Sequence, residues 1–471
     1  MQMRTYDLSG GGIGEKLIAA IRRDILSGVF APGEKLPSKR RLAEHHGVSV
    51  QTVQNAYEQL IAEGFLESRE RSGYFVAALA VPAPRAVREK DAKESAEETP
   101  TYRVDLVSPR TDAERFPFAL WARLSRRVLT EESDLLSPSP AKGIYALRRA
   151  IAAHLVQNKG IEVSPDAVVV GAGNEYLYML LVQLLGRDKV FGVENPGYTK
   201  IAGVYALNGV RLRPITPDGD GIDPAALDGA GVDVLHISPN HHFPTGVVTG
   251  APRRAAILRW ASEGDRFIIE DDYDSEFRFC GKPIPPLFSM DGAGKVVYLN
   301  TFSDTIAPSI RISFMVLPAS LLSRYREICG VYACPVPVFE QHILTRFLSE
   351  GHFERHLRRM RVFYRARREE MIRALQSSPF SDRLEILSAD AGLHFLVKIH
   401  SKKSDEELRE IAKSVGVRVA FLEDYRIDGV RNDTHTALLR YADASPEALG
   451  AALSELAKTQ NPATSKTKKR L

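Results

Sequence analysis

Apolar residues recur at helical spacing near the start of the chain. Residues 15–28 carry one such pattern, which ends at a glycine, and residues 39–46 carry a second, shorter one. Ser38 is a suitable N-cap for the second helix, and Gly47 breaks it. The pattern therefore predicts two helices within the first 47 residues.

A third helix is predicted directly after that glycine. Ser49 can cap a helical pattern that runs over residues 50–64, so two short helices are joined by a tight turn. Residues 65–77 then alternate across a Ser-Gly turn, which is typical of a two-stranded hairpin. Together these elements predict a winged helix-turn-helix.

The rest of the chain follows a different pattern. Short apolar runs (AVVVG, KVFGV, VDVLHIS, RFIIE and KVVYLN) alternate with helical stretches. This alternation predicts an α/β domain with a largely parallel sheet, in which ligand chemistry gathers beyond the carboxyl ends of the strands.

Composition sets the domain limits. The 471 residues exceed one ordinary domain. We predict a DNA-binding domain at 10–78, a linker rich in Pro, Ala and mixed charge at 79–103, a large domain at 104–460 and a disordered basic tail at 461–471.

Bulk chemistry excludes some classes. A formal charge of +4 is mild, so nucleic-acid binding requires a local basic patch. Cys280, Cys329 and Cys334 form no metal-binding spacing and no even disulfide set, and we interpret them as buried small hydrophobic residues. The chain also has no signal-peptide core and no long apolar run, so we expect a soluble cytoplasmic protein without a membrane partner.

The predicted third helix suits DNA. Gln51, Thr52 and Gln54 lie at its start and can present amides and a hydroxyl to base edges in the major groove. Positive side chains around the module can hold phosphates. The alternative is a solvated basic face on a small helical domain. The other candidate DNA-binding residues are Ser38, Arg40, Arg41, Arg69, Arg71 and Gly73.

Residues 14–76 resemble, almost continuously, the winged helix of GntR-type bacterial regulators. The stretch that carries the resemblance is LPSKRRLAEHHGVSVQTVQNAYEQLIAEGFLESRERSGYFV. The resemblance implies promoter DNA as a partner. One departure stands at Val50, where that family often has an arginine at the start of the recognition helix.

Candidate ligand-binding residues follow the predicted strands of the large domain. A Gly-rich turn, residues 171–173, opens a helix whose free N–H groups favour a phosphate. Asp271 and Tyr273 follow one strand, Ser303 and Asp304 follow the next, and Arg311 comes shortly after.

Several motifs in this domain resemble a second family. ENPGY, SPNHHFPTG, IIEDDYDSEFRF, TFS-TIAPSIRISFMVLP and EGHFERHLRRMR are similar to motifs of fold-type-I, pyridoxal phosphate (PLP)-dependent aminotransferases. Coupled to a GntR-type winged helix, they identify the chain as a member of the MocR-type branch of bacterial transcription regulators.

This resemblance implies roles for individual residues. Tyr198 flanks the pyridine ring, Asp271 pairs with the ring nitrogen, and Tyr273 hydrogen-bonds the ring hydroxyl. A phosphate requires charge-assisted donors, and the implied ones are Ser303 and Arg311 with the turn at Gly171, Ala172 and Gly173.

Asp304 departs from the family at the reactive position. The family has a lysine there that forms an imine with PLP, and a carboxylate cannot form a Schiff base or replace that amine as a base. It also repels a phosphate, by roughly 2 kcal/mol at about 7 Å and an effective dielectric near 20. We therefore expect no covalent PLP and no aminotransferase activity.

Two further departures concern charge. Glu175 stands where relatives have glutamine and adds a negative group near the phosphate side. The carboxylate-binding arginine of the family is displaced, since Leu438 occupies its place and Arg440 follows two residues on. Residues i and i+2 of a strand share a face, so Arg440 can reach the pocket in one of the registers that the sequence leaves open.

Three functions stay open on sequence alone. The first is a regulator that binds promoter DNA as a homodimer and senses a small molecule, either an amino compound or non-covalent pyridoxal or pyridoxamine phosphate. The second is a working aminotransferase with a DNA-binding appendage, against which Asp304 counts. The third is a regulator whose large domain is a ligand-free dimerisation scaffold.

Overall fold

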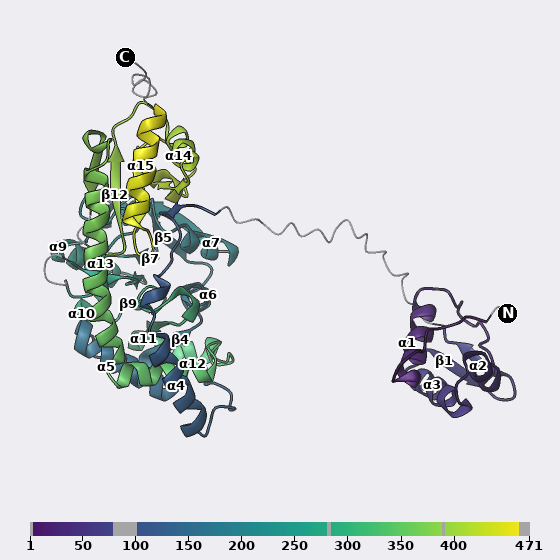
Figure 1. Cartoon of the computed structure of the whole chain (residues 1–471). Coiled ribbons are helices and arrows are strands. Elements are labelled where there is room, and N and C mark those ends of the chain that lie inside the picture. The colour runs from purple at the N-terminus through teal and green to yellow at the C-terminus, as the bar shows by residue number, and fades with distance from the viewer. Residues whose placement is uncertain (1–2, 79–100, 280–283, 389–390, 461–471) are drawn as a thin grey trace, which may run out of the picture. The chain divides into compact units, whose positions relative to one another are not determined.

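The computed structural model describes residues 3–78, 101–279, 284–388 and 391–460. The chain divides between residues 100 and 101 into two compact units, each described here by itself (Figure 1). Most of the predicted linker, the predicted tail and Cys280 lie outside the described residues. None of the helices in the described ranges is long and apolar enough to cross a membrane.

The N-terminal unit has the winged helix-turn-helix arrangement that the sequence predicted. Ser49 begins α3 by accepting a hydrogen bond from the backbone N–H of Thr52 at 3.0 Å, and Ser38 caps α2 through Arg41 at 3.4 Å. Gly47 ends α2 in the left-handed conformation, with φ of 64°. The elements are α1 (Ile13–Leu26), α2 (Lys39–His46), α3 (Val50–Ala62), β1 (Leu66–Arg69) and β2 (Gly73–Val76).

The core of this unit lies among the three helices and the hairpin. Leu17, Val53, Tyr57 and Leu60 are fully buried, because each stands on the inner face of an amphipathic helix. The hydroxyl of Tyr57 donates a hydrogen bond of 2.9 Å to the carbonyl of Pro37. That bond ties α3 to the turn that precedes α2.

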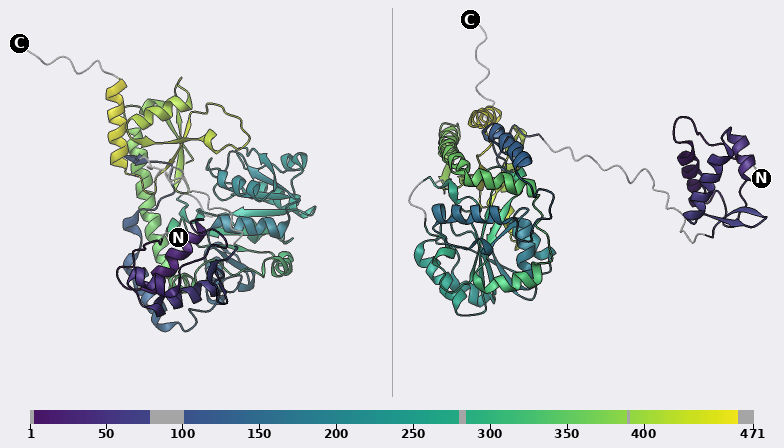
Figure 2. Two further views of the ribbon diagram at one scale, coloured as in Figure 1. Left: turned by 90° about the vertical axis from the view of Figure 1, so that its right-hand side faces the viewer. Right: turned by 90° about the horizontal axis from the view of Figure 1, so that it is seen from below.

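Within the described residues, seven strands form the central sheet of the large unit in the order β4-β10-β9-β8-β7-β5-β6. Five of them, β5 to β9, pair in parallel, while β10 runs antiparallel to both β4 and β9. The strands are β4 (Val168–Gly171), β5 (Val190–Glu194), β6 (Arg211–Ile215), β7 (Val234–Ile237), β8 (Phe267–Asp271), β9 (Val296–Thr301) and β10 (Ser313–Val316). The inner strands have nearly continuous buried runs because helices cover both faces of the sheet, whereas β6 at the edge carries two arginines and is mostly exposed (Figure 2).

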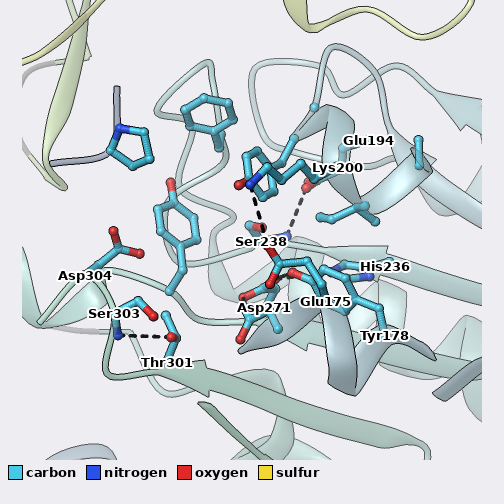
Figure 3. A pocket seen from close by; sticks show the side chains of 18 of the residues that line it. Glu175, Tyr178, Glu194, Lys200, His236, Ser238, Asp271, Thr301, Ser303 and Asp304 are labelled. Carbon is cyan, nitrogen blue, oxygen red and sulfur yellow. Dashed lines mark hydrogen bonds and ion pairs between the residues drawn. The ribbon is translucent and has the colours of Figure 1, made fainter. Parts of the chain in front are cut away.

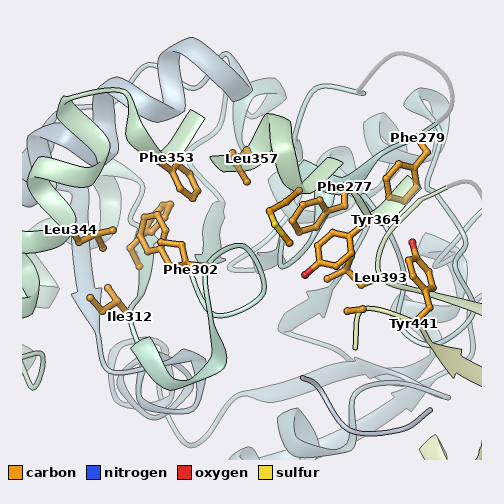
Figure 4. Close-up of a cluster of buried hydrophobic side chains, with 14 of the residues drawn as sticks. Phe277, Phe279, Phe302, Ile312, Leu344, Phe353, Leu357, Tyr364, Leu393 and Tyr441 are labelled. Carbon is orange, nitrogen blue, oxygen red and sulfur yellow. The ribbon is translucent and has the colours of Figure 1, made fainter. Parts of the chain in front are cut away.

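The helices around this sheet follow the alternation seen in the sequence. They are α4 (Phe118–Glu131), α5 (Tyr145–Lys159), α6 (Asn174–Leu185), α7 (Thr199–Leu207), α8 (Pro224–Ala230), α9 (Ala251–Ser262), α10 (Leu287–Met290), α11 (Ala319–Cys329), α12 (Val338–Ser349) and α13 (His352–Gln376). Aromatic side chains fill the core along the buried face of α13, where Phe353 and Tyr364 of this helix lie with Phe277 and Phe302 among aliphatic residues (Figure 4). Cys329 and Cys334 are buried, as the sequence indicated.

A smaller sheet follows α13 along the chain. In the described residues its order is β11-β12-β15-β14, and β3 pairs with β13 beside it. Arg440 ends β15 opposite His394, and Leu438, on the same face, is fully buried. The elements are β3 (Val104–Asp105), β11 (Leu384–Leu387), β12 (His394–Ile399), α14 (Asp405–Ser414), β13 (Val417–Arg418), β14 (Ala420–Phe421), β15 (Thr436–Arg440) and α15 (Pro446–Gln460).

Candidate functional site

A cavity of about 160 Å³ lies at the carboxyl ends of the central strands of the large unit (Figure 3). The start of α6 and the start of α7 complete it, so residues far apart in the sequence meet there. This is the edge at which open α/β sheets bind ligands. Its polar and aromatic lining comprises Asn174, Glu175, Tyr178, Glu194, Tyr198, Lys200, His236, Ser238, Phe243, Asp271, Tyr273, Thr301, Ser303, Asp304, Arg311 and Arg440.

Asp271, the last residue of β8, forms the floor of the cavity. Its carboxylate accepts a hydrogen bond of 2.6 Å from the hydroxyl of Tyr178 and a longer one of 3.5 Å from the amide of Asn174. The Nε2 atom of His236 lies 3.5 Å from the same carboxylate. The two donated hydrogen bonds hold this buried group in place beside the His236 ring, and it can accept a further hydrogen bond from a protonated ligand nitrogen.

Aromatic rings form one wall. Tyr198 and Phe243 pack edge to face, with ring centroids 5.8 Å apart. The hydroxyl of Tyr273 donates to the backbone carbonyl of His241 at 2.9 Å, which fixes the ring of Tyr273 beside the cavity. The wall provides flat apolar surface for a planar or aliphatic ligand.

Asp304 lies beyond the end of β9 and faces Arg440. One carboxylate oxygen of Asp304 lies 3.9 Å from a guanidinium nitrogen of Arg440. Burial raises the pKa of Asp304 to about 6, although Arg440 opposes the shift and Asp274 and Asp271 add to it. With 22% of its side chain exposed, Asp304 is a half-buried carboxylate at the mouth of the cavity.

Glu175 and Arg311 meet at the start of α6. A guanidinium nitrogen of Arg311 donates to the Glu175 carboxylate at 2.6 Å, and the ammonium of Lys200 lies 3.6 Å from the other carboxylate oxygen. Burial opposes ionisation of Glu175. Hydrogen bonds from Arg311 and from its own backbone N–H, with the charges of Arg311 and Lys200, nevertheless hold its pKa below the usual range.

Three metal-capable side chains lie just outside this cavity. His241, Asp274 and His394 are buried, and each offers a ligand atom within 4.8 Å of the others. A hydrogen bond of 3.0 Å joins His241 Nδ1 to Asp274, and the Nε2 atom of His394 is hydrogen-bonded to the carbonyl of Pro244 at 3.2 Å. These bonds connect the two histidines to neighbouring groups of the fold.

Comparisons with known proteins agree with this architecture. Residues 13–76 match the family described as bacterial regulatory proteins, gntR family, and residues 108–431 match aminotransferase class I and II. The uncharacterized HTH-type transcriptional regulator YdeL of Bacillus subtilis is 33% identical over 88% of this chain and 89% of its own length. The probable rhizopine catabolism regulatory protein MocR of Rhizobium meliloti is 31% identical over 94% of this chain and 92% of its own.

The chain belongs to the MocR-type regulators of the GntR family. A further relative is the HTH-type pyridoxine biosynthesis transcriptional regulator PdxR of Corynebacterium glutamicum, 30% identical over 87% of this chain and 88% of its own. The large unit has the fold of an archaeal alanine:glyoxylate aminotransferase, with a TM-score of 0.68 and 25% identity over 80% of this chain and 94% of that one. The protein is thus a DNA-binding regulator with an aminotransferase-like domain, and that fold suggests PLP binding.

Most of the pocket residues that the sequence singled out line this one cavity. They are Tyr198, Asp271, Tyr273, Ser303, Asp304, Arg311 and Arg440. Gly171 ends β4, and Ala172 and Gly173 form the turn before α6; these three predicted residues do not line the cavity. The register that places Arg440 at the cavity is therefore the one that the structure adopts. Ser303 donates its backbone N–H to the hydroxyl of Thr301 at 3.1 Å.

Sequence reasoning missed the partners of Asp271. Tyr178 stands one helical turn after Asn174, so the spacing of these two residues was a usable signal once α6 was placed at the cavity. His236 and Glu194 come from neighbouring strands, and a single sequence does not pair them with the cavity. Burial raises the pKa of Glu194 to about 8, so this lining carboxyl is mostly neutral near pH 7.

In the regulator's winged helix, the candidate DNA-binding residues gather at α2, α3 and the hairpin. Gln51 is exposed and donates to Asn55 at 2.8 Å, and Gln54 donates to Glu58 at 2.8 Å. The hydroxyl of Thr52 lies 2.7 Å from that of the cap Ser49. Arg40, Arg41 and Arg69 are exposed, while Ser38 caps α2 and Gly73 begins β2 with φ of 111°.

Proposed function

We propose that this regulator binds promoter DNA through its winged helix and senses a small molecule in its large domain without forming a Schiff base. The observation that carries the proposal is the Asp304 carboxylate at the cavity mouth, facing Arg440. Asp304 stands in the motif position that holds the reactive lysine in the aminotransferase family, and a carboxylate cannot form an imine.

The cavity fits part of PLP and conflicts with another part. The floor suits a pyridinium ring, because Asp271 is held by Tyr178 and can accept a hydrogen bond from a protonated ring nitrogen. When bound as an imine, PLP supplies an electron sink. This chain offers a carboxylate at the imine position, so covalent attachment in the family's manner is excluded there and aminotransferase activity is not expected.

A compound with an amino group is the effector class that this pocket favours. An ammonium can face Asp304 while its carbon frame packs against Tyr198 and Phe243. The gross attraction of such a pair is roughly 4 kcal/mol at about 4 Å and an effective dielectric near 20, before desolvation takes most of it back. Non-covalent pyridoxamine phosphate belongs to this class, and the relative named for pyridoxine biosynthesis gives vitamin B6 compounds priority in a screen.

On DNA, we assign base contacts to Gln51, Thr52 and Gln54. Their place on the exposed start of α3 supports this assignment, because that end of a recognition helix enters the major groove. Val50, 43% exposed at the first position of α3, offers only an apolar contact. Phosphate contacts are assigned to Ser38, Arg40, Arg41 and Arg69, with Gly73 shaping the wing.

We further propose a homodimer formed by the large domains. Support comes from exposed apolar side chains near α4 and α5, which include Phe118, 65% exposed, and Leu136, 92% exposed. A dimer brings two winged helices, so the promoter site should contain two half-sites. Light scattering at micromolar concentration should give twice the monomer mass, and a monomer there would contradict the proposal.

The decisive test uses PLP on the wild type, Asp304→Lys and Asp304→Asn. Only the lysine variant should develop a visible imine band and retain the cofactor after borohydride reduction. The asparagine variant removes the charge without supplying an amine, so it controls for charge alone. A reduced adduct inside the wild-type pocket, at Lys200 for example, would refute the proposal.

Calorimetry with amino compounds then separates a sensor from a ligand-free scaffold. Only a sensor binds one of these compounds and changes its DNA affinity as a result.

A further inference from the structure

The start of α6 is built as an anion site, and a side chain of the protein already occupies it. The first turn of α6 carries backbone N–H groups that have no side-chain cap at Gly173, together with the positive end of the helix dipole, and the N–H of Glu175 already bonds its own carboxylate. Arg311 adds a guanidinium, held there by its own left-handed backbone with φ of 52°. The anion that these donors hold is the carboxylate of Glu175, 2.6 Å from Arg311.

Gly173 shows how closely this site is packed. A Cβ atom on Gly173 would lie 2.2 Å from a guanidinium nitrogen of Arg311 and 3.1 Å from a carboxylate oxygen of Glu175. The guanidinium therefore rests directly against the backbone of the turn, and the carboxylate rests against the same point. An incoming phosphate would have to take the space and the donors that Glu175 now uses.

The nearby cation is also engaged. The ammonium of Lys200 lies 3.6 Å from Glu175, on the side away from Arg311's contact, since it approaches the other carboxylate oxygen. Asp304 adds a second carboxylate to the same cavity. Among the described residues, the three cations that line the cavity are already paired, Lys200 and Arg311 with Glu175 and Arg440 with Asp304. A phosphate dianion entering here would therefore meet carboxylates and paired cations rather than an open cationic site.

We propose that Glu175 is a built-in substitute for the cofactor phosphate, so that this pocket selects unphosphorylated ligands. The inference rests on the proposed function and narrows its effector to an amino compound without a phosphate group. It disfavours pyridoxamine phosphate relative to pyridoxamine.

The size of the effect follows from exposure. Glu175 is 34% exposed and Arg311 is 49% exposed, and pairs of this kind are weakened by solvent. A phosphate can therefore displace Glu175 at a penalty that we expect to be about tenfold in affinity, not thousandfold. Glutamine at position 175 keeps the shape, removes the charge and frees Arg311 for an external anion.

The test compares PLP with pyridoxal, which has the same ring and aldehyde and no phosphate. Imine absorbance gives the apparent Kd of each aldehyde for Asp304→Lys and for Asp304→Lys combined with Glu175→Gln. The preference for PLP over pyridoxal should rise about tenfold in the double variant. Because the ratio is compared between variants, any difference in free aldehyde content between the two compounds cancels.

Glu194→Gln in the same lysine background is the matched control. Glu194 lines the same cavity, but its pKa of about 8 makes it mostly neutral near pH 7, so its replacement should leave the preference unchanged. A rise below threefold with Glu175→Gln, or an equal rise with Glu194→Gln, would overturn the inference. So would a failure of both lysine variants to bind either aldehyde, because restoring the lysine and freeing Arg311 should suffice.

A second measurement avoids the lysine background. Inorganic phosphate at millimolar concentration should raise the Tm of Glu175→Gln and leave that of the wild type unchanged, and the opposite pattern would count against the inference. These outcomes are distinct from failure of the proposed function. That function fails if the wild type itself forms a reduced PLP adduct, whatever residue stands at position 175.

Discussion

The two units of this regulator use polar side chains in opposite ways. On α3 of the winged helix, the amides of Gln51 and Gln54 lie on one short stretch and each donates to a side chain one turn further on, while Gln54 also accepts a hydrogen bond of 3.1 Å from Lys39 of the neighbouring α2. In the cavity of the large unit, Glu175 pairs with Arg311, 136 residues further along the chain. The glutamine amides lie on the surface of the winged helix, whereas Glu175 and Arg311 in the cavity are bound to each other.

This difference indicates what each surface binds. Exposed amides exchange a neighbour for a base edge at little cost, because water already competes for them. Charges that are paired inside a cavity must be displaced before a ligand of the same charge can enter. The winged helix is therefore ready for DNA as it stands, whereas the cavity is selective against anions that its parent fold accommodates.

The largest expected effect sharpens the cavity side of this comparison. Burial raises the pKa of Asp304 to about 6 from an ordinary value of 3.8, so the folded protein binds a proton that the unfolded chain releases between these pH values. Wild-type stability is therefore lost as pH rises through this window, and Asp304→Asn escapes the loss. At 1.36 kcal/mol per pH unit, the variant should gain about 3 kcal/mol relative to wild type between pH 3 and pH 7 in urea unfolding of the large unit.

Glu175→Gln should change the pH dependence of stability in the opposite direction. In the wild type the pKa of Glu175 is lowered in the folded protein, despite the opposing effect of burial, because Arg311 and Lys200 stabilise the ionised form. Wild type should therefore lose stability relative to this variant as pH falls through the acidic range. For Asp304→Asn, a difference in unfolding free energy from wild type that does not change with pH would contradict the raised pKa of Asp304.

The next effect concerns the outward-facing side. Replacing Gln51 or Gln54 with Ala should weaken binding to the promoter by about 1–3 kcal/mol, because a base contact is lost, and should leave non-specific DNA binding nearly unchanged. Gel shifts with the promoter and with a scrambled duplex measure both quantities. Gln59, which is exposed near the carboxyl end of α3 and donates to Glu63 at 2.8 Å, offers a control by Gln59→Ala, since the assigned base contacts lie at the other end of the helix. Unchanged promoter shifts in both alanine variants would remove α3 as the reading element.

Arg40 should behave differently from the glutamines. It is exposed at the start of α2, and a phosphate contact there carries no base information. Arg40→Ala should weaken specific and non-specific binding alike and reduce the slope of log K against log salt by about one, because one counterion release is lost. An unchanged slope in a salt titration would place Arg40 away from the DNA backbone.

The sequence predicted the winged helix more fully than the cavity, because the contacts of the winged helix are local and those of the cavity are not. Caps and turns at Ser38, Gly47 and Ser49 are local signals, so the winged helix was predicted element by element. Strand ends located Asp271 and Asp304, because parallel strands present their carboxyl ends at one edge. The partners of these carboxylates were not available from local patterns. Arg440 depended on a strand register, and the hydrogen bond from Tyr178 to Asp271 depended on the packing of α6 against the central sheet.

The smallest expected effect tests whether the two N-cap serines stabilise only their own helices. Ser49 caps α3 with a hydrogen bond of 3.0 Å from Thr52, and Ser38 caps α2 with a longer bond of 3.4 Å from Arg41. Loss of an N-cap typically costs about 1 kcal/mol, and we expect a larger cost at Ser49, whose capping bond is the shorter of the two. Ser49→Ala should therefore speed hydrogen exchange of the α3 amides about fivefold, with a smaller change at α2 for Ser38→Ala. Both variants should leave the imine kinetics of Asp304→Lys unaltered, because the two serines lie in the other unit. A change in those kinetics would show that the caps also influence the cavity of the large unit. The winged helix would then not be independent of the cavity in which Glu175 pairs with Arg311.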